Sequence, residues 1–261
     1  MLNSSDPHIE YSLKNGVFRL KINRPNKKNA LLPSMYRSLA TGLSLADSME
    51  EATVILITGV DDCFTSGNDV NGFIAATESK ESGADQPSKM LMHALNETRK
   101  PIVAAISGLA IGIGTTLLMH CDLIYASENC FLQLPFTRLG LCPEAGSSLL
   151  LPKQIGHQRA SELLLLGDRI SAKKAYEYGL VNEVLPQSDY LEYAIQKAYQ
   201  LAALPSKSVQ TSKRLLKKTA IAETRTVINE ELIEFAALLK TPEAQEIVQS
   251  FIDRSAARKS G

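Results

Sequence analysis

Residues 101–121 contain no Asp, Glu, Lys or Arg, and an uncharged run of this length could cross a lipid bilayer. Pro101 opens the run, and three glycines interrupt it, at Gly108, Gly112 and Gly114. These breaks predict a buried strand over 102–106, a glycine-rich turn and a helix that starts near Gly114. We therefore expect a strand–turn–helix unit of an α/β protein, and no membrane span.

A second segment repeats this design. The apolar, largely β-branched residues 53–58 predict another buried strand, and small residues follow it at 63–69. Small residues let a backbone approach a ligand closely, and N–H groups from the two turns could converge on an oxygen that gains negative charge. The same glycines are also compatible with tight turns and close helix–strand packing alone. The turn at 112–114 does not form GxGxxG, which argues against a dinucleotide site.

The whole chain predicts an α/β core, residues 1–200, followed by a helical region, residues 201–261. Further strands are expected at 18–22, 123–126 and 181–185, and helices after Pro33, around Leu91 and Leu95, at 160–166 and at 172–178. After Pro186 the pattern is helical, at 190–204, 209–218, 227–239 and from Thr241 onward. A polar stretch at 78–87 predicts a surface loop. We expect the helical region to pack on the core or on a neighbouring subunit.

Composition narrows the class of protein. Lys+Arg and Asp+Glu balance at 28 each, so no overall charge attracts nucleic acid or an anionic membrane. The four cysteines form no CxxC pair, which favours buried reduced thiols over disulfides or a metal site. We accordingly expect no metal ion. Residues 1–10 lack a signal-peptide core and the chain does not end in Ser-Lys-Leu, so we expect a cytoplasmic protein.

Glu144 is the ionisable residue in the most unusual surroundings. It lies in the sequence LGLCPEAGSS, residues 139–148, among apolar and small residues, and Pro143 precedes it. Such a carboxylate is either exposed on a surface loop or buried away from water. Burial would raise its pKa toward the range of a general base.

Several motifs in this order resemble the crotonase (enoyl-CoA hydratase/isomerase) superfamily over nearly the whole chain. They are NRPNKKNAL at 23–31, SGND at 66–69, KPIVAAISGLAIG at 100–112, CDLIYA at 121–126 and GDRISAKKAYEYGLV at 167–181. The resemblance implies an α/β fold of the crotonase type, a spiral of ββα units, with a C-terminal helical trimerisation region. It also implies a homotrimer or a dimer of trimers.

The resemblance further implies an oxyanion hole made by the backbone N–H groups of Asn68 and Ile113. Hydratases of the family carry two glutamates, six residues before and fourteen residues after the Asp of the CD motif; here Thr116 and Phe136 stand at these positions. The sequence instead resembles the Δ3,Δ2-enoyl-CoA isomerases of the peroxisomal type, which use one glutamate at the position of Glu144. One carboxylate suffices to move a proton from C2 to C4, and Phe136 would help to exclude water.

The resemblance implies an acyl-CoA substrate and no separate cofactor, since coenzyme A is part of the substrate. The backbone of Ala30 and Leu31 would lie beside the adenine, with Arg24 or Lys28 near the phosphates, although Lys27 and Lys28 also fit a solvated turn. The substrate site would also include two turn segments, namely Ser66, Gly67, Asn68, Asp69 and Val70 in the first and Gly112 in the second. The alternatives are a hydratase, a hydrolase or dienoyl-CoA isomerase of the same family, and a non-catalytic module that binds coenzyme A and a partner protein.

Overall fold

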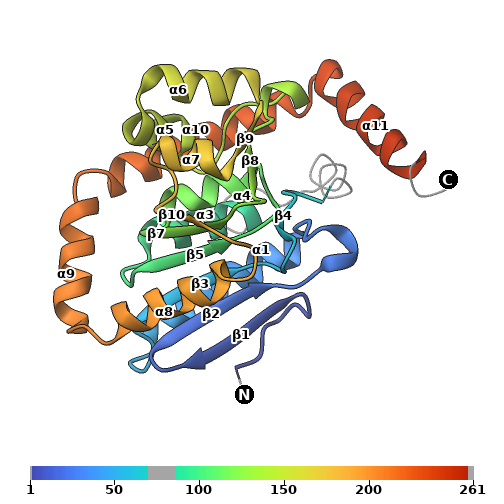
Figure 1. The fold of residues 1–261 in the computed structure, drawn as a ribbon. Helices are drawn as coiled ribbons and strands as arrows, with labels where there is room; N and C mark the ends of the chain where they lie inside the picture. Colours follow the sequence, from blue (N-terminus) through green and yellow to red (C-terminus); the bar gives the residue numbers. More distant parts are fainter. Residues whose placement is uncertain (1, 70–85, 258–261) are drawn as a thin grey trace.

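The computed structural model describes residues 2–69 and 86–257, and a six-stranded sheet runs through this part of the chain (Figure 1). The order of its strands is β1-β2-β3-β5-β7-β10. The strands are β1 (Ile9–Lys14), β2 (Val17–Ile22), β3 (Val54–Thr58), β5 (Ile102–Ile106), β7 (Leu123–Ser127) and β10 (Glu183–Leu185). The pair β1–β2 is antiparallel and the other pairs are parallel.

A four-stranded sheet of three-residue strands lies beside the larger one. Its order is β4-β6-β8-β9, with β4 (Cys63–Thr65), β6 (Leu109–Ile111), β8 (Phe131–Gln133) and β9 (Arg169–Ser171). Three times in succession the chain passes from a strand of the large sheet to a strand of the small one: β3 to β4, β5 to β6 and β7 to β8. Helical segments follow each of these pairs. This repetition is the spiral of ββα units that the sequence predicted.

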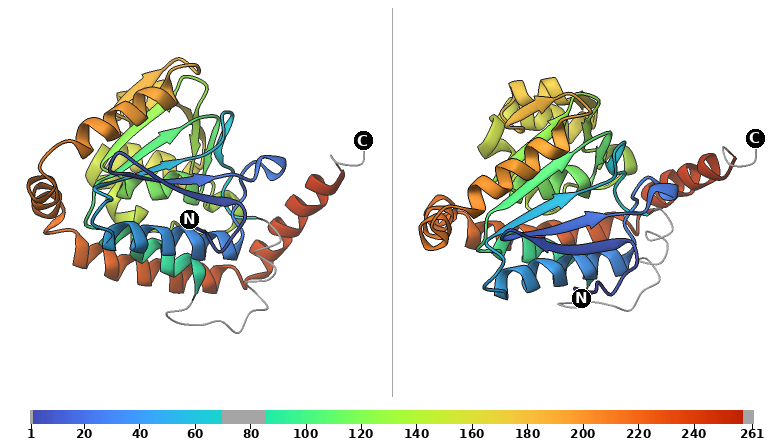
Figure 2. Two further views of the ribbon diagram at one scale, coloured as in Figure 1. Left: turned by 90° about the horizontal axis from the view of Figure 1, so that it is seen from below. Right: turned by 60° about the horizontal axis from the view of Figure 1, so that its bottom comes forward.

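The strand β3 is buried throughout because both faces of the larger sheet are covered. Ile55 and Ile57 belong to the main core, which also contains residues of α1 (Pro33–Ser48) and α3 (Pro87–Glu97). Val54 and Leu56 belong to a second cluster, formed with α8 (Tyr190–Ala202) on the opposite face. Figure 2 shows α8 on one side of the sheet and α1 and α3 on the other.

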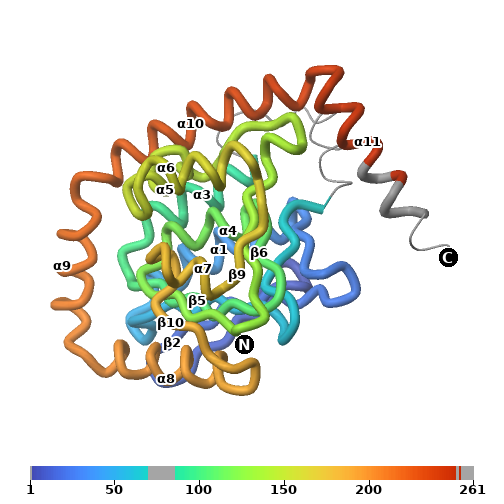
Figure 3. The backbone as a smooth tube through the Cα atoms, turned by 45° about the horizontal axis from the view of Figure 1, so that its top comes forward, coloured from blue at the N-terminus to red at the C-terminus, as the bar shows by residue number. Residues whose placement is uncertain are grey.

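The chain ends in three further helices, and the first two run around the core (Figure 3). They are α9 (Ser206–Lys217), α10 (Ile221–Leu238) and α11 (Pro242–Ala257). The helix α10 lies along α3 and α5 (Ser147–Ile155), whereas α11 extends away from the body of the molecule. The helix α10 therefore packs on the core of its own chain.

Most predicted elements agree with the structure within a few residues. The uncharged run at 101–121 contains β5, β6 and α4 (Ile113–Thr116), and no helix among the described residues is long and apolar enough to span a membrane. The sequence analysis did not identify β1, α5 or the strands of the small sheet, and each strand of the small sheet has only three residues, too few to display a period. The predicted helix over 160–166 is α6 (His157–Ser161) followed by a π-helical turn at Glu162–Leu166. The helix predicted at 172–178 is α7 (Ala172–Glu177).

Candidate active site

The two glycine turns lie side by side because they follow neighbouring parallel strands. Cys63 pairs with Leu109 and Thr65 with Ala110, so β4 and β6 end at the same edge of the small sheet. A Cβ on Gly67 would lie 2.8 Å from the carbonyl oxygen of Ile111. Since Gly67 also has a φ of +91°, glycine is required there on two grounds. The absence of a side chain thus brings the two turns into backbone contact.

The N–H group of Asn68 points away from Leu31, the residue with which Asn68 forms a β-bridge. Leu31 donates its N–H to the Gly67 carbonyl oxygen at 2.8 Å, and Asp69 donates its N–H to the Leu31 carbonyl oxygen at 3.0 Å. Successive amides of an extended chain alternate in direction, so the intervening N–H of Asn68 faces the opposite side. No described residue accepts a hydrogen bond from it.

Ile113 supplies a second available N–H group from the neighbouring turn. Gly112 has φ +57° and ψ −120°, and its N–H donates to the Gln133 carbonyl oxygen at 2.9 Å. Ile113 is the first residue of α4, so its N–H has no partner within the helix. Within the described part of the chain no other acceptor is paired with it. Two backbone donors from adjacent turns are therefore available, as an oxyanion hole requires.

Glu144 is buried, which decides between the two interpretations of its sequence surroundings. Its side chain is 5% exposed, and the Thr116 hydroxyl donates a hydrogen bond to Oε1 at 2.5 Å. Burial raises the pKa of Glu144 to about 8; the Thr116 hydroxyl acts in the opposite direction, and the charge of Glu231 adds to the increase. A carboxyl group with this pKa can both accept and return a proton near neutral pH.

The helix α4 connects Glu144 to the available N–H groups. Ile113 is its first residue and Thr116 its last, so one turn of helix, with a pitch of ~5.4 Å, separates the N–H donor from the hydroxyl bound to Glu144. Thr116 occupies the position where family hydratases carry their first glutamate. Thr116 therefore stands where a hydratase would have a glutamate, and its hydroxyl binds the carboxylate of Glu144.

Tyr36 of α1 links Glu144 to the Asn68 side of the site, and the sequence analysis did not identify it. Its hydroxyl donates a hydrogen bond to Oδ1 of Asn68. Burial and the nearby charge of Glu144 raise the pKa of Tyr36 well above its usual value. Phe136, at the position of the second hydratase glutamate, is 5% exposed and belongs to the main core. Its carbonyl oxygen accepts hydrogen bonds from Leu139 and Leu141, in the turn that precedes Glu144.

The basic entry loop is fixed by a buried side chain. The Nδ2 of Asn29 donates to three carbonyl oxygens, those of Ile22, Cys63 and Phe64. Asn29 has a φ of +52°, and its Oδ1 accepts the N–H of Arg24 at 2.7 Å. Asn29 therefore fastens the loop to the end of β2 and to β4.

Arg24 lies inside this loop and has partners within the protein. Its Nη1 bonds Oδ2 of Asp69 at 2.6 Å and the Ala30 carbonyl oxygen at 2.9 Å, and the side chain is 14% exposed. Lys28 is exposed, with a φ of +49°. Arg24 therefore braces the segment 30–31 against the turn at 66–69, while the side chain of Lys28 is open to solvent.

The remaining predicted substrate residues surround the same turn. The carbonyl oxygen of Lys28 accepts the N–H of Ser66 at 3.0 Å, and Leu31, 1% exposed, pairs with Asn68. Ser66, Ala30 and Gly112 are partly exposed. Val70 and most of the predicted polar loop at 78–87 lie outside the described residues. The structure thus gathers Ala30, Leu31 and residues 66–69 in one place.

The loop that carries Glu144 is held by two further side chains that the sequence analysis did not identify. Glu231 of α10, 7% exposed, accepts hydrogen bonds from the N–H of Gly146 at 2.5 Å, the N–H of Ser148 at 2.9 Å and the Ser148 hydroxyl at 2.6 Å. Glu231 continues a buried stripe with Thr224 and Ile228 on α10. Because charged residues are rarely fully buried without a partner, a glutamate at helical spacing from Thr224 and Ile228 could have identified Glu231 from the sequence.

His120 supports the loop from the other side. Burial lowers the pKa of His120 to about 3, so its ring is neutral. Its Nε2–H donates to the Ala145 carbonyl oxygen at 2.8 Å. The peptide group that follows Glu144 is therefore fixed by a buried histidine.

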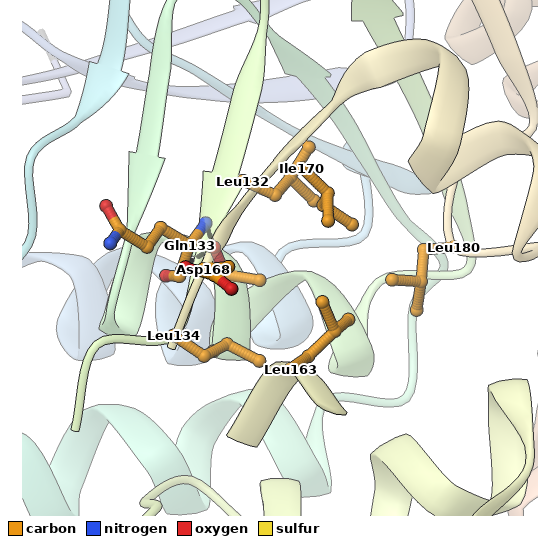
Figure 4. Close-up of a pocket in the computed structure, with 8 residues that line it drawn as sticks. Leu132, Gln133, Leu134, Leu163, Asp168, Ile170 and Leu180 are labelled. Atoms are coloured by element: carbon orange, nitrogen blue, oxygen red, sulfur yellow. Dashed lines mark hydrogen bonds between the residues drawn. The ribbon is translucent and has the colours of Figure 1, made fainter. Parts of the chain in front are cut away.

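Other candidate features lie elsewhere or are not present in the described residues. A small hollow beside β8 is lined mainly by leucines, with Gln133 and Asp168, and includes none of the predicted site residues (Figure 4). Cys63 and Cys130 are buried free thiols, while Cys121 and Cys142 are free and partly exposed. In residues 2–69 and 86–257 we find no group of three His, Cys, Asp or Glu side chains that could hold a metal ion.

Comparison with known proteins gives the family. The family model described as enoyl-CoA hydratase/isomerase matches residues 12–259. The chain is 34% identical over 242 residues to enoyl-CoA delta isomerase 2 of Rattus norvegicus, with 92% of this chain and 62% of the rat protein covered. It therefore spans less than two thirds of that relative.

A hydratase and a solved structure are also similar. The chain is 31% identical over 238 residues to the 2,3-dehydroadipyl-CoA hydratase of Escherichia coli (strain K12), with 91% of this chain and 92% of that protein covered. The structure of Pseudomonas aeruginosa OdaA superposes with a TM-score of 0.90 and 43% identity, over 94% of this chain and 99% of that chain. The chain therefore belongs to the enoyl-CoA hydratase/isomerase family.

Proposed function

We propose that this enzyme is a Δ3,Δ2-enoyl-CoA isomerase, which moves the double bond of a 3-enoyl-CoA to the conjugated 2-position. The observation that carries the proposal is the pairing of Glu144 with Thr116. Where hydratases position water with two glutamates, this chain has Thr116 and Phe136. A buried carboxylate bonded to Thr116 supports a reaction that needs one acid/base group and no water.

The proposed reaction has two proton transfers. Ionised Glu144 takes a proton from C2 of the substrate, and the electron pair of that C–H bond moves into the thioester carbonyl to give a dienolate. The N–H groups of Asn68 and Ile113 stabilise the negative oxygen, an interaction typically worth about 10²–10³ in rate for each donor. Protonated Glu144 then returns the proton at C4, which leaves the double bond between C2 and C3 and regenerates the carboxylate.

The environment of Glu144 supports both halves of this cycle. A pKa of about 8 gives a stronger base than an exposed glutamate and leaves about one tenth of the carboxyl groups ionised at about pH 7. The buried surroundings also exclude water from the dienolate, which disfavours addition to the double bond. Phe136 contributes to this exclusion in our proposal.

We place coenzyme A along the entry loop. The backbone of Ala30 and Leu31 takes the adenine, and Lys28, whose side chain is exposed, approaches the phosphates. Arg24 contributes chiefly through the Ala30 carbonyl and Asp69, to which it is bonded. The turn residues Ser66, Gly67, Asp69, Val70 and Gly112 complete the proposed acyl-CoA site.

The test is to supply a 3-enoyl-CoA and to follow formation of the conjugated 2-enoyl thioester by its absorbance. We expect turnover by the parent protein and none by Glu144→Gln, which keeps the size of the side chain but cannot take the proton. Isothermal titration with a saturated acyl-CoA should give similar dissociation constants for both. Glu230→Gln, an exposed neighbour on α10, is the matched control and should behave like the parent.

Each alternative has its own outcome in this assay. Undiminished isomerisation by Glu144→Gln would remove Glu144 from the mechanism. Efficient hydration of a 2-enoyl-CoA would favour the hydratase alternative, which the similarity to the Escherichia coli hydratase keeps open, and release of free coenzyme A would favour a hydrolase. Binding without turnover would favour the non-catalytic module.

The proposed enzyme also has an expected oligomeric state and an expected compartment. We propose a homotrimer or a dimer of trimers in the cytoplasm, with residues 1–200 as the catalytic core and residues 201–261 in oligomerisation. Light scattering coupled to gel filtration measures the assembly directly, and a monomer in solution would contradict it.

A further inference from the structure

The loop at 144–148 adopts a conformation that its own residues do not favour. Ala145 has a φ of +59° and Gly146 a φ of +75°. Alanine rarely adopts the left-handed region, because its Cβ approaches the following carbonyl group. Glycine adopts this region freely, but Ala145 does not, so the conformation at Ala145 needs support from the surrounding structure.

That support comes from the C-terminal region, 83 to 85 residues further along the chain. The Oε2 atom of Glu231 accepts the Gly146 N–H, while Oε1 accepts both the N–H and the hydroxyl of Ser148. The helix α10 also rests directly on the loop: a Cβ on Gly146 would lie 2.8 Å from Cγ2 of Thr224. Both carboxylate oxygens are therefore committed to the loop that carries Glu144.

The pattern of bonds requires a carboxylate. Three donors converge on the two oxygens, and hydrogen bonds to a charged acceptor are about twice as strong as those between neutral groups. Burial raises the pKa of Glu231, while the bonds from Ser148 and Gly146 oppose that increase. A glutamine could still accept from Ser148, but its amide N–H₂ would then face the Gly146 N–H, donor against donor.

Several other groups lie around Glu144 and Glu231, and those that titrate contribute to the pH dependence of activity. Tyr36 of α1 and Thr116 of α4 face Glu144. Burial raises the pKa of Cys142 to about 11, and the charges of Glu231, Glu234 and Glu144 add to the increase. Glu231 is the carboxylate whose charge acts on Glu144 itself.

We propose that Glu231 is a positioning residue for the acid/base reaction: it holds the loop at 144–148 so that the Glu144 carboxyl group stays against Thr116 beside the two backbone N–H donors. The proposal rests on the proposed role of Glu144. It makes the helix α10 a component of the active site in addition to any part it takes in assembly.

The experiment compares Glu231→Gln with the parent in the isomerase assay over a range of pH. We expect kcat to fall by about 10- to 100-fold with KM changed by less than about twofold, since misplacement of a catalytic group impairs chemistry more than binding. The loss of a negative charge should also lower the pKa of Glu144 from about 8, so the acidic limb of the pH profile moves to lower pH. NMR titration of isotope-labelled glutamate carboxyl groups measures the same change without substrate.

Two controls separate positioning from helix packing. Glu230→Gln removes an exposed charge from the next position of α10 and should leave kcat, the pH profile and the titration of Glu144 unchanged. Ser148→Ala removes one of the three donors and keeps the carboxylate, so it should lower kcat about threefold and should fold even if Glu231→Gln does not.

The outcomes distinguish this proposal from the proposed function. Loss of turnover in Glu144→Gln together with a parent-like kcat and pH profile in Glu231→Gln would overturn the role of Glu231 alone. So would parent-like kcat in Ser148→Ala, if Glu231→Gln cannot be folded. Full turnover in Glu144→Gln would overturn the proposed function itself.

Discussion

The two sides of the candidate active site are held in different ways. The side with Asn68 and Ile113 consists of backbone N–H groups on two turns, which follow adjacent strands and touch through Gly67 and Ile111. The side with Glu144 is a side chain on an irregular loop, fixed by the side chains of Thr116, His120 and Glu231. The first side depends on main-chain geometry and the second on distant side chains.

This difference predicts how each side responds to substitution. On the backbone side, replacing a side chain leaves the donors in place, and a new Cβ at a required glycine does the damage. On the Glu144 side, removal of one hydroxyl or carboxylate changes both the position and the pKa of the reacting group. The two sides should therefore be sensitive to different substitutions, the backbone side to a new Cβ and the Glu144 side to the loss of a polar group.

The largest effect is expected at Gly67. Gly67→Ala places a Cβ 2.8 Å from the Ile111 carbonyl oxygen at a φ of +91°, so the turn that carries the Asn68 N–H must move. Loss of one oxyanion donor lowers kcat by about 10²–10³-fold. Gly179→Ala is the control: its φ is +82°, but nothing lies within 4 Å of the new Cβ. Kinetics and urea unfolding of both variants make the comparison, and equal losses of kcat would contradict it.

The next effect concerns stability and its dependence on pH. The pKa of Glu144 is about 8 in the folded protein and near 4.5, the ordinary value for a glutamate, in the unfolded chain. Below pH 4.5 both states hold the proton; between 4.5 and 8 the unfolded chain releases it and the folded protein does not, so this group makes folding less favourable as pH rises. Glu144→Gln removes the effect.

Glu144→Gln should therefore be more stable than the parent at alkaline pH, with little difference under acidic conditions. Because one pKa unit corresponds to ~1.4 kcal/mol, the advantage at about pH 9 should be roughly 2–5 kcal/mol. Urea unfolding at about pH 5, 7 and 9 measures it. The same pH dependence in both proteins would show that Glu144 titrates as an exposed glutamate does.

A smaller effect is expected at Thr116. Thr116→Val keeps the shape of the side chain but removes the hydroxyl that donates to Glu144, so the pKa of Glu144 rises further above about 8. The acidic limb of kcat/KM moves to higher pH, and kcat/KM at neutral pH should fall about tenfold, in line with ~1.5–3 kcal/mol for a hydrogen bond to a charged group. Thr116→Ser retains the hydroxyl and should stay within about threefold of the parent. A Val variant with the parent's pH profile would contradict the role of this bond.

The same contrast decides what could be predicted from the sequence. The turns at 66–69 and 112–114 are local, since each follows a buried strand and contains its glycines, and the family resemblance then implied which N–H groups would be the donors. The burial of Glu144 was left open, because burial depends on what packs over the loop. Its partners could not be predicted, since Thr116 lies 28 residues away and Glu231 lies on a helix outside the ββα units.

The fold followed a similar rule. Strands of five or six residues, such as β2, β3 and β5, displayed their pattern, whereas the three-residue strands β4, β6 and β8 did not. Yet β4 and β6 are the strands that bring the two turns together. The elements that assemble the site are too short for periodicity to detect, and the resemblance to a family was needed to join the turns.

The smallest effect tests the place where the two sides meet, at Tyr36. Tyr36→Phe removes the hydroxyl that donates to Oδ1 of Asn68 and leaves the ring in the core. Because the Asn68 N–H is held by the main chain through Leu31, we expect kcat to fall only about three- to tenfold, the equivalent of ~0.5–1.5 kcal/mol for one neutral hydrogen bond. Tyr11→Phe is the matched control, since Tyr11 donates to the Ser38 carbonyl oxygen on the same helix α1. A loss in Tyr36→Phe as large as in Gly67→Ala would mean that the Asn68 donor is positioned by side chains too, and the division between the two sides would not hold.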